Sequence, residues 1–292
     1  MTGAVHETTR IRERLDGVLT MLWLSLIFGA VVGLSLGLTG GGGAIFAVPL
    51  LVYGLGVDAR EAIAISLAAV GATSLVGFLH RWKLGQVELH TGLLFAVAGM
   101  VGAPFGTWIA GFLPETVLLL SFAGLMVLVA VRLWQQASHP VLPEPACPSP
   151  DHVDGPTCQR DAAGVLILTS RCAILLLMVG VLTGVLSGLF GIGGGFVIVP
   201  ALVLFSDMSI HRAVGTSLMV IALVSVSGVA SQLWAGHAIS PVITVLFVVG
   251  GIAGLFAGQQ VGRRLSGAAL QKIFVVAILA VAAFVIIRNL SA

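Results

Sequence analysis

The sequence predicts an all-α polytopic membrane protein made of two homologous, inverted repeats. Each repeat has a glycine-broken helix pair and three further transmembrane helices, roughly 8–10 helices in all. Three observations predict this fold: few charges, apolar segments of bilayer length, and a glycine pattern that occurs twice. Of the 292 residues, 58% are hydrophobic and 9% are charged, whereas soluble domains carry about 25% charged residues. Open sheet edges do not occur in lipid and barrel strands alternate in polarity, so continuous apolar runs must be helices.

The composition also excludes several classes of protein. Charges this sparse rule out an ordinary soluble enzyme and a disordered chain. The net charge of +2 is too small to attract a phosphate backbone, so we expect no nucleic acid as a partner. The expected location is the cell's inner (plasma) membrane, crossed several times, with membrane lipid as a partner.

Ten apolar segments account for the helices in chain order. They lie at 18–38, 44–56, 62–79, 90–112, 116–134, 165–189, 195–206, 213–235, 240–262 and 270–288. Most approach the roughly 20 residues that cross a bilayer core. Segments 44–56 and 195–206 are too short, and each follows a glycine cluster. As one straight helix, residues 22–56 would be about 52 Å long against a core of about 30 Å, so the chain must break at the glycines, where breaking costs least.

Two polar stretches complete the division of the chain. Residues 1–17 form a polar N-terminal tail, and residues 135–164 form a proline-rich flexible linker. The linker separates repeat 1, residues 18–134, from repeat 2, residues 165–292. The linker holds Cys147 and Cys158, which we expect to be reduced thiols. Without a framework to fix ligand geometry, we expect no metal there, and we expect no cofactor elsewhere.

The two halves carry one glycine pattern at a fixed separation of 151 residues, the distance from Gly33 to Gly184. At that offset both halves read G-x₃-G-x₃-G-x₂-G-x-G-G-x₅-P. Downstream matches are Ala62 with Ala213, Ser66 with Ser217, Leu67 with Leu218, and Gly85 with Gly236. Internal repeats are a usual construction of secondary transporters, whose substrate site lies at discontinuous helices near the membrane midplane.

The relative orientation of the repeats has two solutions. An odd number of crossings in each half inverts the second repeat, and an even number makes the repeats parallel. Lys and Arg divide nine inside and five outside for inverted repeats with the N-terminus outside. Parallel repeats with the N-terminus inside give the same division, so the positive-inside rule does not choose. Both solutions place the linker in the cytoplasm. We favour inversion because segment lengths require a true break.

The glycine clusters are the first candidate binding site. A helix that begins inside the membrane has N–H groups without partners, and these carry partial positive charge. They stabilise an anion without a buried Lys or Arg. The alternative role is close helix packing, which suits the glycines spaced four apart, Gly29, Gly33 and Gly37 with Gly180, Gly184 and Gly188. The expected substrate-binding residues at the clusters are Gly41, Gly42, Gly43, Ala44, Gly193, Gly194 and Gly195.

Polar side chains near the clusters are further candidates. Thr39, Ser66, Thr216 and Ser217 carry hydroxyls that donate to a sulfonate or carboxylate oxygen. Their alternative role is a hydrogen bond to their own helix, commonly to the carbonyl four residues back. His80 and Gln232, late in the second helix of each half, are candidates to border a vestibule.

The acidic residues point away from a cation substrate. None of the 12 lies within an apolar segment away from its ends, whereas cation transporters keep carboxylates at membrane depth. A secondary carrier for a small anion explains this together with the repeats and the broken helices. The alternatives are a non-transporting membrane scaffold and an intramembrane enzyme. No metalloprotease motif or membrane-depth aspartate pair is present, so we expect no catalytic residue and no enzyme.

The stretches GLTGGGGAIFAVPLLV and GVLSGLFGIGGGFVIVPALV, the second followed by RAVGTSL, resemble the TauE/SafE family of sulfite and organosulfonate exporters. The resemblance runs from about residue 20 to 290. It implies a transporter of small sulfur-containing anions such as sulfite, sulfoacetate or other sulfonates, by export or uptake. A homodimer is compatible with it, although the residues themselves do not indicate one. The first half departs from the pattern, because Ala64-Ile65-Ser66 stands where the second half has Gly215-Thr216-Ser217.

Overall fold

The computed structural model describes most of the two expected repeats. The described residues are 2–138, 159–160, 166–167, 170–195, 198–199, 202, 208, 210–237, 239–262 and 267–290. The expected linker 135–164, with Cys147 and Cys158, and the expected short segment 195–206 lie largely outside them.

The first half contains the expected broken helix. Helix α1 spans Thr2–Thr39, and its apolar part begins at Leu19. Residues 2–17 of the expected polar tail therefore form the first part of helix α1. After the glycines, three short helical pieces follow without interruption: η1 Gly42–Phe46, α2 Ala47–Pro49 and η2 Leu50–Gly54. The full-length helices of this half are α3 Ala59–Lys83, α4 Leu89–Phe112 and α5 Glu115–Ser138.

The second half has helices in corresponding places. These are α6 Ser170–Phe190, α8 Ile210–Trp234, α9 Pro241–Gly262 and α10 Gly267–Leu290. Before α6, strand β1 Gln159–Arg160 pairs antiparallel with β2 Leu166–Ile167. Within the described chain, six helices are long and apolar enough to span a membrane, and three shorter apolar helices accompany them. The expected all-α membrane fold is confirmed.

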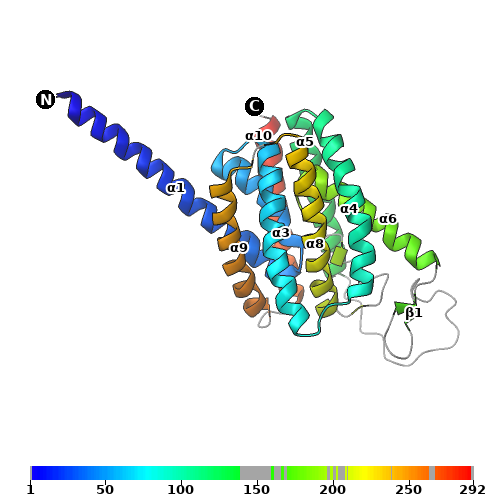
Figure 1. Ribbon diagram of the computed structural model, residues 1–292. Coiled ribbons are helices and arrows are strands. Elements are labelled where there is room, and N and C mark those ends of the chain that lie inside the picture. The colour runs from blue at the N-terminus through cyan, green and yellow to red at the C-terminus, as the bar shows by residue number, and fades with distance from the viewer. Residues whose placement is uncertain are drawn as a thin grey trace.

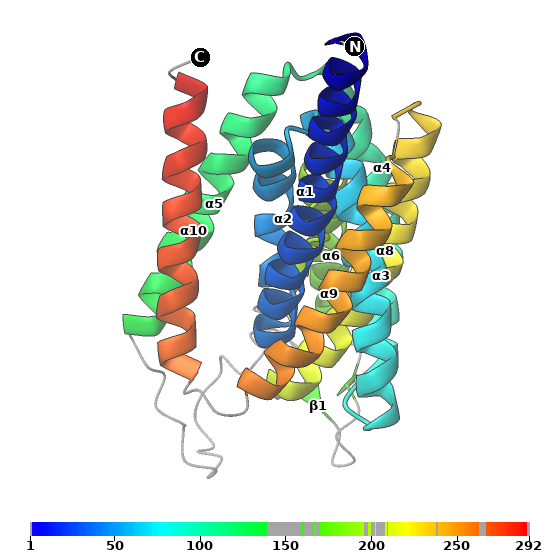
Figure 2. The same ribbon diagram turned by 90° about the vertical axis from the view of Figure 1, so that its left-hand side faces the viewer.

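The helices of the two halves are interleaved. Helix α1 packs on α9, and α6, its counterpart at the offset of 151, packs on α4. The first helix of each half therefore packs against a helix of the other half. Helices α3 and α8 pack side by side (Figure 1), and α5 packs with α10 at the opposite edge of the bundle (Figure 2). The colours show that α3 and α8 run in opposite directions (Figure 1). Inversion of the complete repeats stays a prediction.

Spaced glycines make the interleaved contacts. A methyl group built on Gly33 of α1 would overlap the carbonyl oxygen of Gly251 in α9, and one built on Gly184 of α6 would overlap that of Gly99 in α4. Gly29, Gly37, Gly180 and Gly188 also meet the backbone of these partner helices. Close backbone approach through small residues is how membrane helices associate without a hydrophobic driving force. The packing role of these glycines is therefore confirmed.

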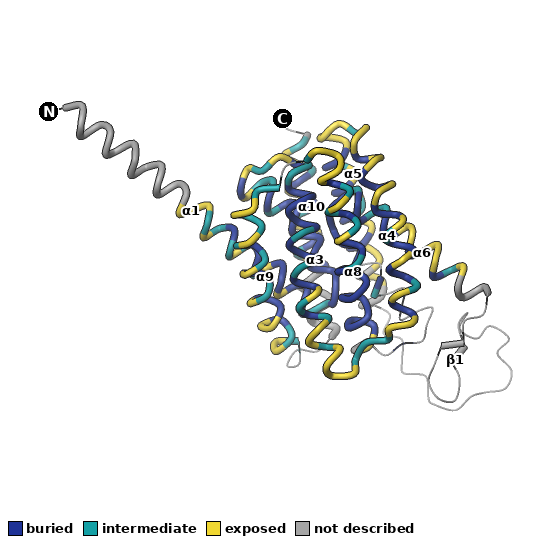
Figure 3. The backbone as a smooth tube through the Cα atoms, in the orientation of Figure 1, coloured by how far each residue is buried: buried dark blue, intermediate teal, exposed yellow. Residues whose placement is uncertain are grey.

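The burial pattern fits a lipid environment. Buried residues fill the middle of the bundle and exposed residues cover its outside (Figure 3). Large apolar side chains are exposed on the outer surface, among them Trp23, Val97, Leu128 and Ile287. The polar side chains Ser66, Thr183, Ser217 and Ser225 are buried. The interior is mainly apolar and includes these few polar groups, so the apolar outer surface is the feature that fits contact with lipid.

Candidate functional site

Both breaks begin with the same backbone turn. The N–H of Gly40 donates to the carbonyl of Leu36 at 2.8 Å, and the N–H of Gly191 donates to that of Ser187 at 2.8 Å. The two glycines have φ angles of 75° and 73°. This left-handed conformation ends a helix at little cost only for a residue without a Cβ. The predicted breaks therefore exist at Gly40 and Gly191, at matching positions.

The two breaks lie against each other in the interior. A Cβ built on Gly41 would lie 2.6 Å from the Cα of Gly195, and one built on Gly195 would lie 2.5 Å from the Cα of Gly41. The expected site residues Gly41–Ala44 and Gly193–Gly195 are all buried. The structure therefore brings the seven backbone candidates into one enclosed region.

Several N–H groups in this region are available. Those of Gly42 and Gly43 precede the first hydrogen-bonded turn of η1, so they have no intrahelical partner. Gly193 and Gly194 both have φ angles of 68°. Among the described residues, no hydrogen bond uses the N–H of Gly193 or Gly194. These buried donors are the groups that an anion requires.

Ser66 and Ser217 contact the breaks but not in the expected way. The Ser66 hydroxyl donates to the carbonyl of Gly191 at 2.7 Å, and the Ser217 hydroxyl donates to the carbonyl of Gly40 at 2.6 Å. The oxygen of Ser217 also lies 2.9 Å from the carbonyl of Val214. Each serine thus reaches the break of the opposite repeat. In this arrangement their protons are engaged by the backbone.

The two threonines are also engaged by protein groups. The Thr39 hydroxyl donates to the carbonyl of Ser35, four residues back, at 2.8 Å. Thr216 accepts a hydrogen bond of 3.0 Å from the N–H of Glu88, directly before α4, and its hydroxyl lies 3.8 Å from the sulfur of Met208. Thr39 therefore takes the alternative role, and Thr216 fastens the start of α4 to α8.

Three buried serines that sequence reasoning missed have free hydroxyls. Ser74, Ser187 and Ser225 are at most 2% exposed, and their hydroxyls have no hydrogen-bond partner in the described part of the chain. Ser74 and Ser225 occupy matching positions at the offset of 151, so that offset was the signal for them. A Cβ built on Gly193 would lie 3.8 Å from the Ser225 oxygen. Ser225 therefore extends the donor region of the second break.

A groove leads toward Ser225 from the outer surface. It has a volume of about 460 Å³ and runs between α3 and α8. Its walls are apolar, including Leu67, Leu75, Val226 and Leu233, and Ser225 is its most deeply buried polar residue. The groove connects the lipid-facing side of these helices with the neighbourhood of Gly193.

The vestibule candidates His80 and Gln232 lie apart. His80 is exposed near the end of α3, edge-on to the ring of Phe256 at 5.5 Å. Gln232 is buried near the end of α8, and its Oε1 lies 2.7 Å from Nδ1 of His237. These two helix ends are at opposite ends of the bundle (Figure 1). Gln232 contacts His237, which lines a cavity.

No cluster of three or more His, Cys, Asp or Glu side chains with metal-binding geometry occurs among the described residues. The donors gathered at the breaks are N–H and O–H groups, which suit an anion, and an N–H group offers no lone pair to a cation.

Comparison with known proteins agrees with a membrane transporter. A family model described as "Sulfite exporter TauE/SafE" matches residues 25–285. A probable membrane transporter protein of Xylella fastidiosa is 35% identical over 266 residues, covering 89% of this chain and 93% of the relative. The probable membrane transporter protein YdhB of Bacillus subtilis is 29% identical over 244 residues, covering 82% and 89%. No solved structure matches the chain.

Proposed function

Since the chain belongs to the sulfite exporter TauE/SafE family and is a multi-pass membrane transporter, we propose that it carries small sulfur-containing or organic anions across the plasma membrane. Sulfite, sulfoacetate and other sulfonates are the proposed substrates. The family description supports an oxyanion of sulfur. The lack of acidic residues within the apolar segments supports an anion over a cation.

The proposed binding site is the paired glycine breaks. The observation that carries it is the gathering of buried donors for which the described residues supply no partner: the N–H groups of Gly42, Gly43, Gly193 and Gly194, and the hydroxyl of Ser225. A tetrahedral or pyramidal oxyanion has several oxygens that accept such bonds from different directions. Buried unpaired donors cost free energy, and an anion between them would recover it.

The substrate requires the breaks to move apart. Because Gly41 and Gly195 are in backbone contact, an anion does not fit between them in this arrangement. The bonds that hold the breaks together are those of Ser66 to Gly191 and Ser217 to Gly40. We propose that these bonds open alternately toward the two membrane faces. Inverted repeats supply two equivalent halves for such a cycle, and the opposite directions of α3 and α8 support that orientation (Figure 1).

A transporter role agrees with the expectation that the chain is not an enzyme. A scaffold without transport activity is the alternative, and a flux measurement separates the two. Liposomes that contain the purified protein are loaded with radiolabelled sulfite, sulfoacetate, acetate or sulfate. The flux of each anion across the membrane is then measured with and without a pH gradient. We expect saturable flux of at least one sulfur-containing anion, with competition by the others. Folded protein that moves no anion, or that moves Na⁺ instead, would refute the proposal.

A further inference from the structure

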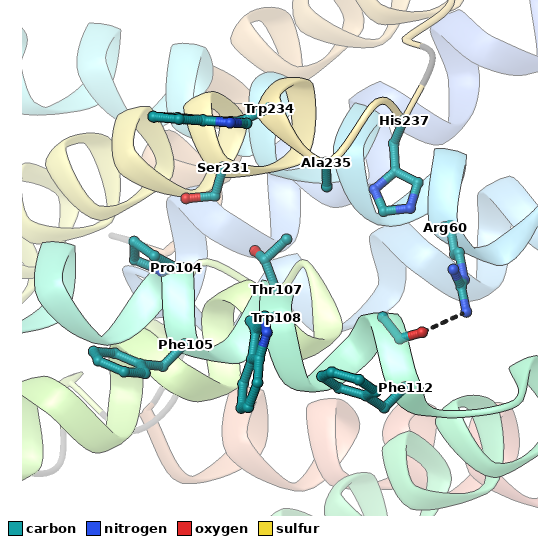
Figure 4. A pocket seen from close by; sticks show the side chains of 11 residues that line it. Arg60, Pro104, Phe105, Thr107, Trp108, Phe112, Ser231, Trp234, Ala235 and His237 are labelled. Carbon is teal, nitrogen blue, oxygen red and sulfur yellow. Dashed lines mark hydrogen bonds between the residues drawn. The ribbon is translucent and has the colours of Figure 1, made fainter.

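A separate cavity lies where α4 and α8 end together. Its volume is about 760 Å³, Arg60 near the start of α3 lines it (Figure 4), and its lining includes none of the glycines of the two breaks. Both helices are membrane-spanning by length and composition, and they end at Phe112 and Trp234. The cavity therefore opens at the level where the bilayer core meets the headgroups.

One end of the cavity is lined by two basic side chains, Arg60 and His237. The Arg60 guanidinium donates to the carbonyls of Gly111 at 3.3 Å and Leu113 at 3.2 Å, which anchors it at the C-terminus of α4. His237 lies beside it, with Nδ1 held by Gln232 at 2.7 Å, so that Nε2 is left for a ligand. Figure 4 shows both side chains at the same end of the cavity. An acidic group would be attracted to this end.

A free hydroxyl lies farther inside. Thr107 is 4% exposed, and its Oγ1 has no hydrogen-bond partner in the described part of the chain. It lines the cavity between Ser231 and Trp108 (Figure 4). The hydroxyl is therefore available to a polar ligand atom at this depth.

The other walls are apolar and open to the membrane. Phe105, Trp108, Phe112 and Trp234 line them and are largely exposed, Trp234 to 93%. Aromatic rings at the ends of spanning helices are typical of the interface between lipid and water. The cavity is thus amphipathic, with the basic side chains Arg60 and His237 at one end and aromatic rings along its sides. Its volume also far exceeds that of a small oxyanion.

We propose that this cavity binds one anionic phospholipid. The headgroup phosphate lies against Arg60 and His237, the glycerol or ester oxygens reach the Thr107 hydroxyl, and an acyl chain follows Phe105 and Trp108. Charge complementarity selects an anionic headgroup, and the aromatic walls select an amphiphile over a soluble anion. This inference does not depend on the identity of the transported substrate.

Native mass spectrometry of the full-length protein in detergent tests the proposal. Phosphatidylglycerol, phosphatidylcholine and glycerol 3-phosphate are titrated separately at pH 6. We expect phosphatidylglycerol to bind with the highest affinity and Arg60→Gln to weaken it roughly fivefold or more. Lys83→Gln removes an exposed charge at the far end of α3 and is the matched control, with no expected change.

Two further variants keep the test valid if Arg60→Gln fails to fold, since Arg60 also caps α4. His237→Gln and Thr107→Val leave that cap intact, and each is expected to weaken phosphatidylglycerol binding. Unchanged binding in both variants would overturn the proposal. Equal affinity for phosphatidylcholine would also overturn it, because charge would then play no part. If glycerol 3-phosphate bound as tightly as the lipid, the cavity would be a soluble-anion site and the lipid assignment would be wrong.

Discussion

Ser66 and Ser217 make reciprocal hydrogen bonds across the two halves of the molecule. Ser66 donates to the carbonyl of Gly191, and Ser217 donates to that of Gly40, which is the matching glycine of the other repeat. Each serine therefore holds the end of the helix that breaks in the opposite half. These two bonds join the repeats at the place where we propose that substrate is held.

Replacing either serine is expected to loosen the contact between the breaks. Ser66→Ala and Ser217→Ala each leave a buried carbonyl without its donor, at a cost of about 1–3 kcal/mol. Thermal unfolding in detergent measures the loss. Ser231→Ala is the control, because its hydroxyl bonds locally to the carbonyl of Ser227 within α8 and its loss costs less. Equal stability of Ser66→Ala and Ser231→Ala would contradict the proposed joining role.

Replacing Ser225 is expected to weaken transport without lowering stability. Its hydroxyl has no partner among the residues that the structure describes, so we expect Ser225→Ala to leave the melting temperature unchanged. If the hydroxyl donates to the anion, its loss raises the KM for transport by about tenfold or more, since a bond to a charged group contributes about 1.5–3 kcal/mol. Liposome flux against substrate concentration gives KM. Wild-type KM in a stably folded Ser225→Ala protein would remove Ser225 from the site.

A substitution at Gly193 tests whether the backbone of the second break takes part in transport. The φ of 68° at Gly193 disfavours any side chain, and a Cβ there would lie 2.9 Å from Ile221. We expect Gly193→Leu to abolish anion flux while the protein still inserts into the membrane, as judged by yield and by the elution profile in detergent. Undiminished flux in this variant would show that the break does not contact substrate.

Gly33 is expected to matter for packing alone. Gly33→Ala forces a methyl group onto the carbonyl of Gly251 and must push α1 away from α9. The matched control is Gly124→Ala in α5, where a Cβ would have nothing within 4 Å. Thermal unfolding should show a loss of stability for the first variant and none for the second. Equal melting temperatures would mean that α1 and α9 do not need close approach.

The proposed lipid cavity is expected to respond to pH through His237. Burial first, and the charge of Arg60 second, lower the pKa of His237, while Asp58 acts in the opposite direction. The imidazole is therefore neutral at pH 7.5 and gains its charge only below the pH at which an ordinary histidine titrates. Phosphatidylglycerol affinity should rise as pH falls from 7.5 to 5.5.

The variant His237→Gln isolates that effect. Gln cannot be protonated in this pH range, so the phosphatidylglycerol affinity of the variant protein should change little between pH 7.5 and 5.5. The comparison is made by the same mass-spectrometric titration at both pH values. An equally steep pH response in the variant would assign the effect to another group.

The sequence by itself determined the class of fold and the places where helices break. Segment length and lack of charge are properties of the local chain, and bilayer thickness converts them directly into spanning helices. Left-handed turns at Gly40 and Gly191 follow from an equally local property, the absence of a Cβ. The offset of 151 residues also marked Ser66 and Ser217 as a pair.

Only the tertiary structure decided what these residues contact. A hydroxyl on a membrane helix ordinarily bonds to its own backbone, as Thr39 does. Sequence offers no means to distinguish Ser66, which reaches another repeat, from Ser225, which has no partner among the described residues. The pairing of α1 with α9, and the meeting of Arg60 with His237, join segments more than 150 residues apart. Such contacts arise from packing among all the helices, because no local pattern records which distant surface a side chain will face.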